Sequence, residues 1–246
     1  MIPANYNDPS YDYIKYWNGR EYENQAEELA LKKLLSTNGK DILDVGGGFG
    51  RLSLVYSKYF SNITIADSSS KILGQAVAFT KEHNITIKTI ESNVYDLSKN
   101  TRDIYDCVLM VRVCHHLDNL EKAFREINSV LDKDGTFIVE YANKLNFKSV
   151  FKNLLKLNFG YFNIKPVSVA VASDVNFSNF HPKYVEKALV DAGFKVVEKL
   201  SVSNLRFPLL KKYLPVSVMV RVENALQKPL SYLNFGPSIF LKCVKK

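Results

Sequence analysis

A cluster of glycines is the clearest chemical signal in the sequence. Four of them fall within five positions, behind an acidic residue, in the order Asp44, Val45, Gly46, Gly47, Gly48, Phe49, Gly50. Glycine is needed where the backbone takes a positive φ, or where it lies so close to a ligand that a Cβ would collide. The pattern favours a ligand-binding loop, and the alternative is a tight turn that binds nothing.

A second candidate is Asp67, which stands 23 positions after Asp44 at the end of an apolar run and is followed by Ser68. A carboxylate at the end of the second strand of a βαβ unit can accept hydrogen bonds from two ribose hydroxyls. Asp67 is therefore predicted to bind a nucleoside beside the glycine loop. The alternative is a local role, in which Asp67 caps the helix that follows.

Two adjacent histidines, His115 and His116, follow the apolar run at residues 105–111. In open α/β sheets, ligands bind outside the carboxyl ends of the strands, so this segment is expected to border a reaction site. One histidine can act as general base or orient an acceptor hydroxyl, while the other packs. A metal site with Cys114 is disfavoured, because adjacent residues cannot easily aim at one ion.

These residues need alternating strands and helices to position them. Apolar runs between turn residues predict strands at about residues 42–45, 62–66, 85–90, 105–111, 136–141, 194–202 and 238–244. Helical periodicity predicts helices at about residues 21–35, 51–59, 70–79, 119–134, 144–156 and 182–192, with more helices over 205–233. This order predicts a doubly wound, mostly parallel sheet.

The frame of the glycine loop indicates which ligand it serves. A dinucleotide fingerprint, G-x-G-x-x-G, started at Gly46 would need glycine where Arg51 stands. The pattern acidic-apolar-G-x-G-x-G fits throughout and resembles the first motif of class I S-adenosylmethionine (SAM) dependent methyltransferases. His115-His116-Leu117 also resembles a family segment, and the likeness is to the small-molecule branch, the quinone and lipid type. It implies a seven-stranded Rossmann-like sheet with an antiparallel last strand, and a helical lid after strand five.

The resemblance also implies a set of residues that bind S-adenosyl-L-methionine: Asp44, Gly46, Gly47, Gly48, Gly50, Asp67, Ser68, Asn93, Val94, Val111, Arg112, Tyr13 and Arg20. Asn93 stands where the family often has an aspartate that accepts from the adenine amino group, and its amide oxygen can do the same. Tyr13, Trp17 and Arg20 come from an aromatic segment just before the first helix. A leading helix of this sort caps the cofactor cleft in many small-molecule members, so the resemblance makes these residues candidates to line the site. The alternative for each aromatic is packing on the core.

Composition and charge bound the class of protein. The 246 residues carry a net charge of +8, and residues 1–143 have 16 Lys+Arg against 20 Asp+Glu, whereas residues 144–246 have 17 against 5. The basic half favours an anionic partner, and the alternative is a solvated face.

No run reaches the roughly 20 apolar residues that span a bilayer, and the first ten residues lack a signal core. A cytoplasmic protein is expected. Three cysteines without C-x-x-C spacing indicate neither disulfides nor zinc.

A basic amphipathic helix is predicted after the fifth strand, because lysines recur every four residues at Lys144, Lys148, Lys152 and Lys156 with apolar residues between them. In the family, an insertion here commonly covers the acceptor pocket. The same composition can lie on an anionic membrane surface or lipid. An ordinary surface helix is the third alternative.

The sequence therefore predicts a single methyltransferase domain over 1–246: an N-terminal cap (1–39), a SAM-binding core (40–143), a lid insertion (144–181) and a C-terminal part of the sheet with added helices (182–246). The expected activity is methyl transfer to a small, anionic or amphipathic acceptor, without a metal. An RNA methyltransferase is an alternative, although nucleic acid is an unlikely partner without a stacking surface or RNA-binding module. A non-catalytic SAM-binding protein is another, and a nicotinamide oxidoreductase is disfavoured by the glycine frame.

Overall fold

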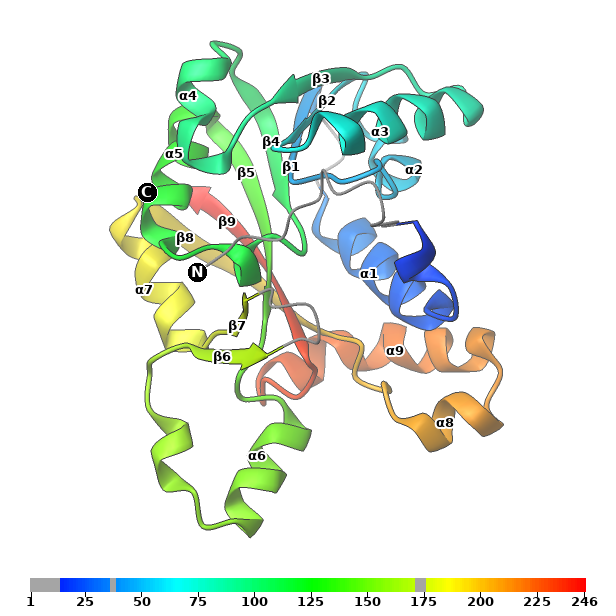
Figure 1. The fold of residues 1–246 in the computed structure, drawn as a ribbon, viewed down its shortest axis with the longest axis vertical. Helices are drawn as coiled ribbons and strands as arrows, with labels where there is room; N and C mark the ends of the chain where they lie inside the picture. The colour runs from blue at the N-terminus through cyan, green and yellow to red at the C-terminus, as the bar shows by residue number, and fades with distance from the viewer. Residues whose placement is uncertain (1–13, 36–38, 171–175) are drawn as a thin grey trace.

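The computed structural model describes residues 14–35, 39–170 and 176–246, and its centre is a twisted seven-stranded sheet (Figure 1). The order of the strands is β3-β2-β1-β4-β5-β9-β8, and all neighbours are parallel except those that include β9. The strands are β1 (Asp41–Val45), β2 (Asn62–Asp67), β3 (Lys88–Glu91), β4 (Tyr105–Met110), β5 (Leu131–Ala142), β8 (Phe194–Val202) and β9 (Ser238–Lys245). The predicted doubly wound sheet with an antiparallel last strand is confirmed.

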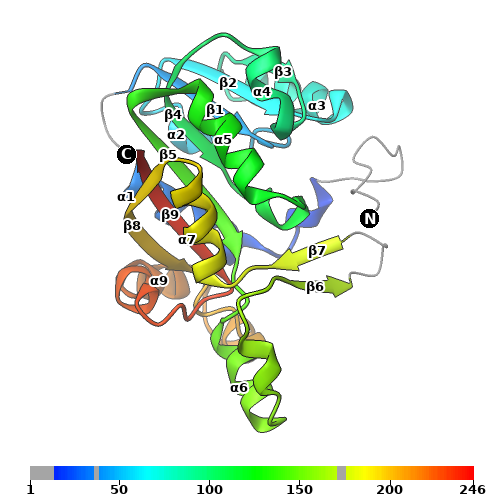
Figure 2. The same ribbon diagram turned by 90° about the vertical axis from the view of Figure 1, so that its left-hand side faces the viewer.

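Helices cover both faces of this sheet, and each face has its own apolar core (Figure 2). One core contains residues of α5 (Leu120–Val130) and α7 (Pro182–Asp191), and the other contains residues of α1 (Glu21–Leu34), α3 (Ser70–Glu82) and α9 (Val216–Ser231). The central strands alternate between the two: Val108 and Met110 of β4 join the first core, whereas Cys107 and Leu109 join the second. Strands buried on both faces read as continuous apolar runs, which is why they could be recognised.

The remaining helices are short or lie at the margins of the sheet. They are α2 (Ser53–Tyr56), α4 (Leu97–Asn100), α6 (Phe147–Leu155) and α8 (Pro208–Tyr213), with the 3-10 helices η1 (Lys15–Trp17), η2 (Val94–Asp96), η3 (Cys114–His116) and η4 (Phe159–Phe162). Figure 1 shows α6 and α8 at the lower end of the molecule, away from the glycine loop between β1 and α2.

Four sequence predictions differ from the structure. The helix expected to continue to about residue 134 ends at Val130, because Leu131 already pairs with Tyr105 of β4. The third strand begins at Lys88 rather than residue 85, and the helix after the glycine loop has only four residues. The hairpin of β6 (Val167–Ala170) and β7 (Asn176–Asn179) was not predicted, since its strands are short and partly polar. Strand β7 lies against η3.

Lys144 is a further correction, because it does not belong to the solvent-facing stripe of the basic helix. It precedes α6 and is fully buried, and its ammonium group donates to the backbone oxygens of Asn163 and Lys165, at 2.7 Å each. Buried lysines require such partners. Lys144 therefore fastens the segment after α6 to the end of β5.

Among the described residues, no helix combines the length and the apolar composition that crossing a bilayer requires.

Candidate functional site

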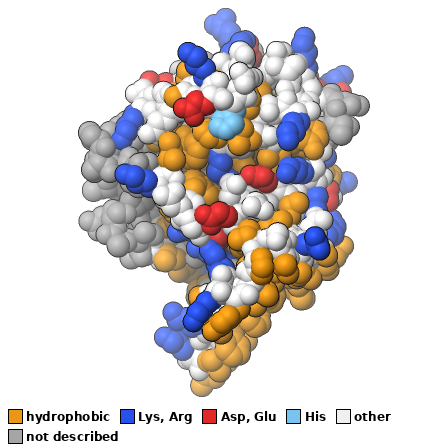
Figure 3. Space-filling model, turned by 90° about the vertical axis from the view of Figure 1, so that its right-hand side faces the viewer, with side chains coloured by type: hydrophobic (Ala, Val, Ile, Leu, Met, Phe, Trp, Pro, Cys, Tyr) orange, Lys and Arg blue, Asp and Glu red, His pale blue; other side chains and the backbone are white. Residues whose placement is uncertain are grey.

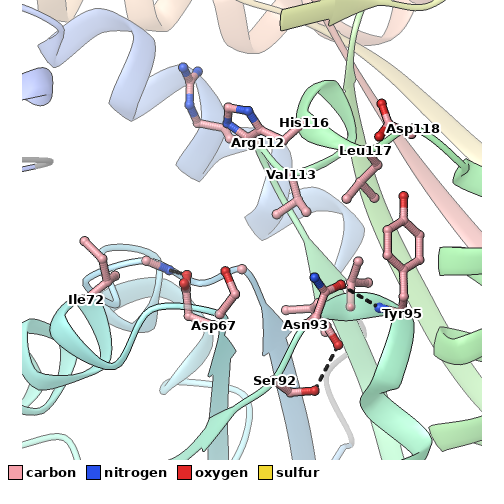
Figure 4. A pocket seen from close by; sticks show the side chains of 15 residues that line it. Asp67, Ile72, Ser92, Asn93, Tyr95, Arg112, Val113, His116, Leu117 and Asp118 are labelled. Atoms are coloured by element: carbon pink, nitrogen blue, oxygen red, sulfur yellow. Dashed lines mark hydrogen bonds between the residues drawn. The ribbon is translucent and has the colours of Figure 1, made fainter. Parts of the chain in front are cut away.

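A cavity lies where β1, β2, β3 and β4 end, at the edge of the sheet where α/β proteins bind ligands. Each of these strands contributes a short segment to its wall. The lining residues are Val45, Gly46, Gly48, Asp67, Ser68, Ile72, Ser92, Asn93, Val94, Tyr95, Arg112, Val113, His116, Leu117 and Asp118. Figure 4 shows Arg112 and His116 on one side of the cavity and Asp67 and Asn93 on the other.

The structure brings together eight of the residues predicted from the sequence: Gly46, Gly48, Asp67, Ser68, Asn93, Val94, Arg112 and His116. Asp44, Gly47, Gly50, Val111, His115 and Arg20 are not among the residues that line this cavity. Tyr13 lies outside the described residues.

The glycine loop needs its glycines for two separate reasons. Gly46, Gly48 and Gly50 adopt positive φ angles of 65°, 58° and 80°, and residues with a Cβ rarely adopt such backbone angles. Gly46 is also tightly packed, because a Cβ there would lie 2.3 Å from a methyl carbon of Val113. A Cβ on Gly47 would lie 2.8 Å from the carboxyl group of Asp44. The loop therefore brings its backbone against both the cavity and the buried acid beneath it.

Asp44 is a buried support for the loop. Its carboxylate accepts a hydrogen bond from the hydroxyl of Tyr56 at 3.0 Å, and burial raises the pKa of Asp44 to about 7. The Tyr56 hydrogen bond and the charge of Arg51 oppose that rise. The Asp44 carboxylate therefore packs against Gly47 of the loop and is not part of the cavity wall.

Asp67 has the position and chemistry expected of a nucleoside ligand. Its two oxygens accept hydrogen bonds from the backbone N–H groups of Ser69 at 3.0 Å and Gly48 at 3.3 Å. Burial still raises the pKa of Asp67, although backbone hydrogen bonds from Ser69, Gly48 and Ser68 oppose the rise. Each carboxylate oxygen can accept a second hydrogen bond, so the side chain keeps capacity for hydroxyl donors in the cavity.

Asn93 is less available than the sequence suggested. Its side-chain oxygen accepts from the backbone N–H of Tyr95 at 3.0 Å, which caps η2. The hydroxyl of Ser92 donates to the Asn93 backbone oxygen at 2.9 Å. The amide oxygen retains one lone pair for an adenine amino group, and its NH₂ group adds donors that an aspartate would lack.

Arg112 is fixed by three elements of the fold. Its backbone lies at a positive φ of 62°, and its N–H donates to the buried carboxylate of Glu140 at 2.8 Å. Its guanidinium contacts the carboxylate of Glu27 on α1 at 3.2 Å and the hydroxyl of Tyr16. Glu27 also pairs with Arg51, at the end of the glycine loop. This network ties α1 to both the loop and the cavity.

The part of the aromatic leading segment that the structure describes, from residue 14 on, joins the same network without lining the cavity. The guanidinium of Arg20 lies over the ring of Tyr16 at 4.1 Å, and that of Arg51 lies over Trp17 at 3.7 Å. Sequence reasoning missed Glu27 and Glu140. A signal was present for Glu140, which is an acidic residue within the apolar run at residues 137–142, whereas Glu27 stands among polar neighbours. Buried charges of this kind are stable when they are paired and hydrogen-bonded.

The two histidines occupy different environments. His116 lines the cavity, and burial together with the charge of Arg112 lowers its pKa to about 4. His115 is buried, and its ring stacks on Phe177 of β7 with centroids 3.9 Å apart. Desolvation also lowers the pKa of His115. Both rings are uncharged near neutral pH. His116 can therefore accept a hydrogen bond from an O–H or N–H group of a molecule bound in the cavity. Among the described residues, no cluster of His, Cys, Asp or Glu could hold a metal ion.

The predicted lid contacts the site through its hairpin. Of the described residues that line the cavity, none comes from α6, whereas Phe177 of β7 packs on His115. The lid role of residues 144–181 stays a prediction.

Known proteins share this fold and part of this sequence. A family model described as a methyltransferase domain matches residues 43–139. The ubiquinone biosynthesis O-methyltransferase of Rickettsia canadensis is 23% identical over 64% of the chain and 64% of that enzyme. The chain spans 47%, 64% and 39% of the lengths of three curated relatives, so their whole activities do not transfer to it directly.

Solved structures agree with the fold. An S-adenosylmethionine-dependent methyltransferase from Clostridium acetobutylicum superposes with a TM-score of 0.58 and 12% identity, covering 96% of this chain and 93% of that one. The [4+2]-cyclase SpnF superposes with a TM-score of 0.56 and 16% identity, covering 92% and 81%. The architecture alone therefore does not fix a reaction. Residues 43–139 therefore match a methyltransferase domain, and the sheet and helices built around them have the fold of S-adenosylmethionine-dependent methyltransferases.

Proposed function

We propose that the chain transfers a methyl group from S-adenosylmethionine to a small, amphipathic or anionic acceptor. The observation that carries the proposal is the division of one cavity into a nucleoside side, with Asp67 and Asn93, and a reaction side, with Arg112 and His116 (Figure 4). The residues of the nucleoside side fit the cofactor, because a partly desolvated carboxylate can accept from ribose hydroxyls, and the Asn93 amide keeps one oxygen lone pair and its NH₂ group for an adenine ring.

The bound cofactor supplies a methyl group that its cationic sulfur has already activated, so the protein's main task is orientation. Holding two reactants in a productive geometry can contribute about 7 to 11 kcal/mol to lowering a barrier. His116 is uncharged and can accept a hydrogen bond from the acceptor's O–H or N–H group. With a pKa of about 4 it is a weak base, so orienting the acceptor is its proposed role.

The acceptor class is inferred from the rest of the wall. Val113, Leu117 and the ring of Tyr95 supply apolar surface, and Arg112 supplies a positive charge that the carboxylates of Glu27 and Glu140 offset in part. An acceptor with an apolar body and an acidic or hydroxyl group fits this combination. The similarity to a ubiquinone biosynthesis O-methyltransferase supports the same class.

The first test is calorimetric titration with S-adenosylmethionine, S-adenosylhomocysteine and NADH. We expect micromolar binding of the first two and none of the third. Binding of NADH alone would overturn the assignment of the cofactor.

The second test uses methyl-labelled S-adenosylmethionine with separate RNA, water-soluble and lipid extracts. Label in the lipid or soluble fraction is the expected result. Label in RNA would favour the RNA alternative, and tight binding without any transfer would favour a non-catalytic SAM-binding protein.

A further inference from the structure

Large apolar side chains are exposed at one end of the molecule. Of the described large hydrophobic residues that are exposed, most come from α6 with the residues after it and from the α8–α9 arm: Phe147, Phe151, Leu154, Leu155, Leu157, Phe159, Ile164, Leu209, Tyr213, Leu214, Val218, Val222, Tyr232 and Leu233. Figure 3 shows hydrophobic side chains gathered over this lower end, with lysine and arginine side chains among them.

Two neighbouring segments form this surface, which we call the basic apolar face and define as residues 147–164 and 206–214. They contact each other at the base of α6. The ammonium group of Lys148 donates to the backbone oxygen of Arg206 and lies 4.4 Å from the ring centroid of Phe207. The ring of Phe147 stacks on Phe235, which follows α9, at 4.9 Å. The base of α6 is thus anchored, while its far end projects from the molecule (Figure 2).

Folding does not account for these apolar residues. Neither α6, η4 nor α8 has a buried residue, and their contribution to the described cores is the partly buried Leu210 of α8. Leu155 and Leu157 are 71% and 74% exposed. Leu157 also lies at a positive φ of 52°, where glycine or asparagine would be the less strained choice. Neither backbone conformation nor internal packing therefore requires a leucine at this position.

The charge of the face is of one sign. Residues 147–164 contain three lysines and no acidic residue, and residues 206–214 contain three Lys or Arg and no acidic residue. Of the second set, Arg206 and Lys211 pair with Glu23 of α1. Lys148, Lys152 and Lys156 recur beside the apolar residues of α6. Helices that lie in a membrane interface have this composition, in which apolar side chains are flanked by lysines. The lysine stems extend along the apolar surface and keep the ammonium groups in water.

We propose that the basic apolar face docks on an anionic lipid bilayer, with its phenylalanines and leucines entering the interface and its lysines contacting lipid phosphates. A second copy of the chain is a poor occupant, because two such faces would bring like charges together. An acidic protein partner would match the charge, but the projecting leucines at residues 155 and 157 fit a deformable apolar layer better than a preformed pocket. The proposal is separate from methyl transfer, since docking requires no cofactor.

Vesicle flotation tests the proposal with the full chain in the absence of S-adenosylmethionine. The vesicles are phosphatidylcholine alone, or equal parts of phosphatidylcholine and phosphatidylglycerol. We expect binding to the anionic vesicles only, and we expect it to weaken as salt rises because exposed charges are screened.

Two double variants divide the apolar and charged contributions. Leu155→Gln/Leu157→Asn should lower anionic vesicle binding by about tenfold, because two apolar side chains no longer leave water. Asparagine is compatible with the backbone at position 157, so the unfolding temperature should not fall. Lys152→Ser/Lys156→Ser should also lower binding by about tenfold, since each lysine near an anionic surface contributes to attraction. The matched control is Ile104→Gln/Val190→Asn, which removes two exposed apolar residues elsewhere and should bind as the wild type does.

Several outcomes would overturn the proposal. They are absence of binding to anionic vesicles, equal binding to neutral vesicles, unchanged binding of both variants on the basic apolar face, or equal loss in the control. Analytical ultracentrifugation supplies one more: a dimer that Leu155→Gln/Leu157→Asn dissociates would show that a second copy covers this face. None of these results would affect cofactor binding, so the proposed function is tested independently.

Discussion

Replacing Asp67 by asparagine tests the assignment of the nucleoside side most directly. The shape of the side chain is kept, but the charge and one acceptor oxygen are lost. In the wild type, both oxygens already accept backbone hydrogen bonds, from Ser69 at 3.0 Å and Gly48 at 3.3 Å. In Asp67→Asn, one of these N–H groups faces an NH₂ group, and the ribose hydroxyls lose a charged acceptor.

The size of the effect follows from the kind of bond that is lost. A hydrogen bond to a charged group contributes a net of about 1.5 to 3 kcal/mol, so the Kd for S-adenosylmethionine should rise about 10- to 150-fold. Stability should respond less than affinity, because two effects oppose each other. Burial raises the pKa of Asp67, so removing the charge relieves a cost in the folded state, whereas loss of one backbone hydrogen bond destabilises it. The unfolding temperature of the variant near neutral pH should therefore change little.

Calorimetric titration with S-adenosylmethionine and S-adenosylhomocysteine measures the affinity, and thermal unfolding measures the stability. The matched control is Glu91→Gln, which removes a negative charge from the exposed residue that pairs in register with Asp67 on the neighbouring strand β3. An unchanged Kd in Asp67→Asn would remove Asp67 from the cofactor site. An equal loss of affinity in Glu91→Gln would show that the overall negative charge at this edge of the sheet, not a specific contact, accounts for the effect.

Three further substitutions test the loop, its support and the reaction side. The folded pKa of Asp44, about 7, lies above the unfolded value of roughly 3.9, so the folded state holds more protons between these values and wild-type stability rises as pH falls through that window. Denaturation near pH 8 should show a larger free energy of unfolding for Asp44→Asn than for the wild type. This difference should shrink by up to about 1.4 kcal/mol per pH unit towards pH 4. A difference that is the same at every pH would contradict the raised pKa. Gly46→Ala should destabilise by about 1 to 3 kcal/mol, because its Cβ would meet Val113 at 2.3 Å in a positive-φ backbone, and adding Val113→Ala should restore part of the loss by relieving the contact alone. His116→Ala should lower kcat more than it weakens S-adenosylmethionine binding, and equal losses in both would make His116 a structural residue.

The central sheet and the position of Asp67 could be predicted because they depend on local signals. Strands buried on both faces are continuous apolar runs, and the frame of the glycines selects one family among loops of similar composition. Asp67 was found from its place at the end of a strand, and the order of parallel strands brings that end beside the glycine loop. For these features, short-range pattern and global fold agree.

The rest of the site depends on contacts between distant parts of the chain. Lys144 continues the four-residue spacing of the basic helix, yet it is buried because Asn163 and Lys165 supply acceptors that periodicity cannot reveal. His115 and His116 look equivalent in sequence. They differ because Phe177, 62 positions along the chain from His115, covers one ring and leaves the other at the cavity.

Arg112 shows how the scaffold and the site are joined. A non-glycine residue at positive φ costs of order 1 to 2 kcal/mol relative to ordinary backbone, and such strain persists only where surrounding contacts over-determine it. Here the contacts are specific: Glu140 accepts the Arg112 backbone N–H at 2.8 Å, and Glu27 holds its guanidinium at 3.2 Å. A glycine would satisfy the backbone at lower cost but would leave Glu27 with Arg51 alone and would remove the only strand-end cation from the described cavity wall. The strained turn at the end of β4 therefore serves to place a positive charge at the cavity, and α1 is the element that keeps it there.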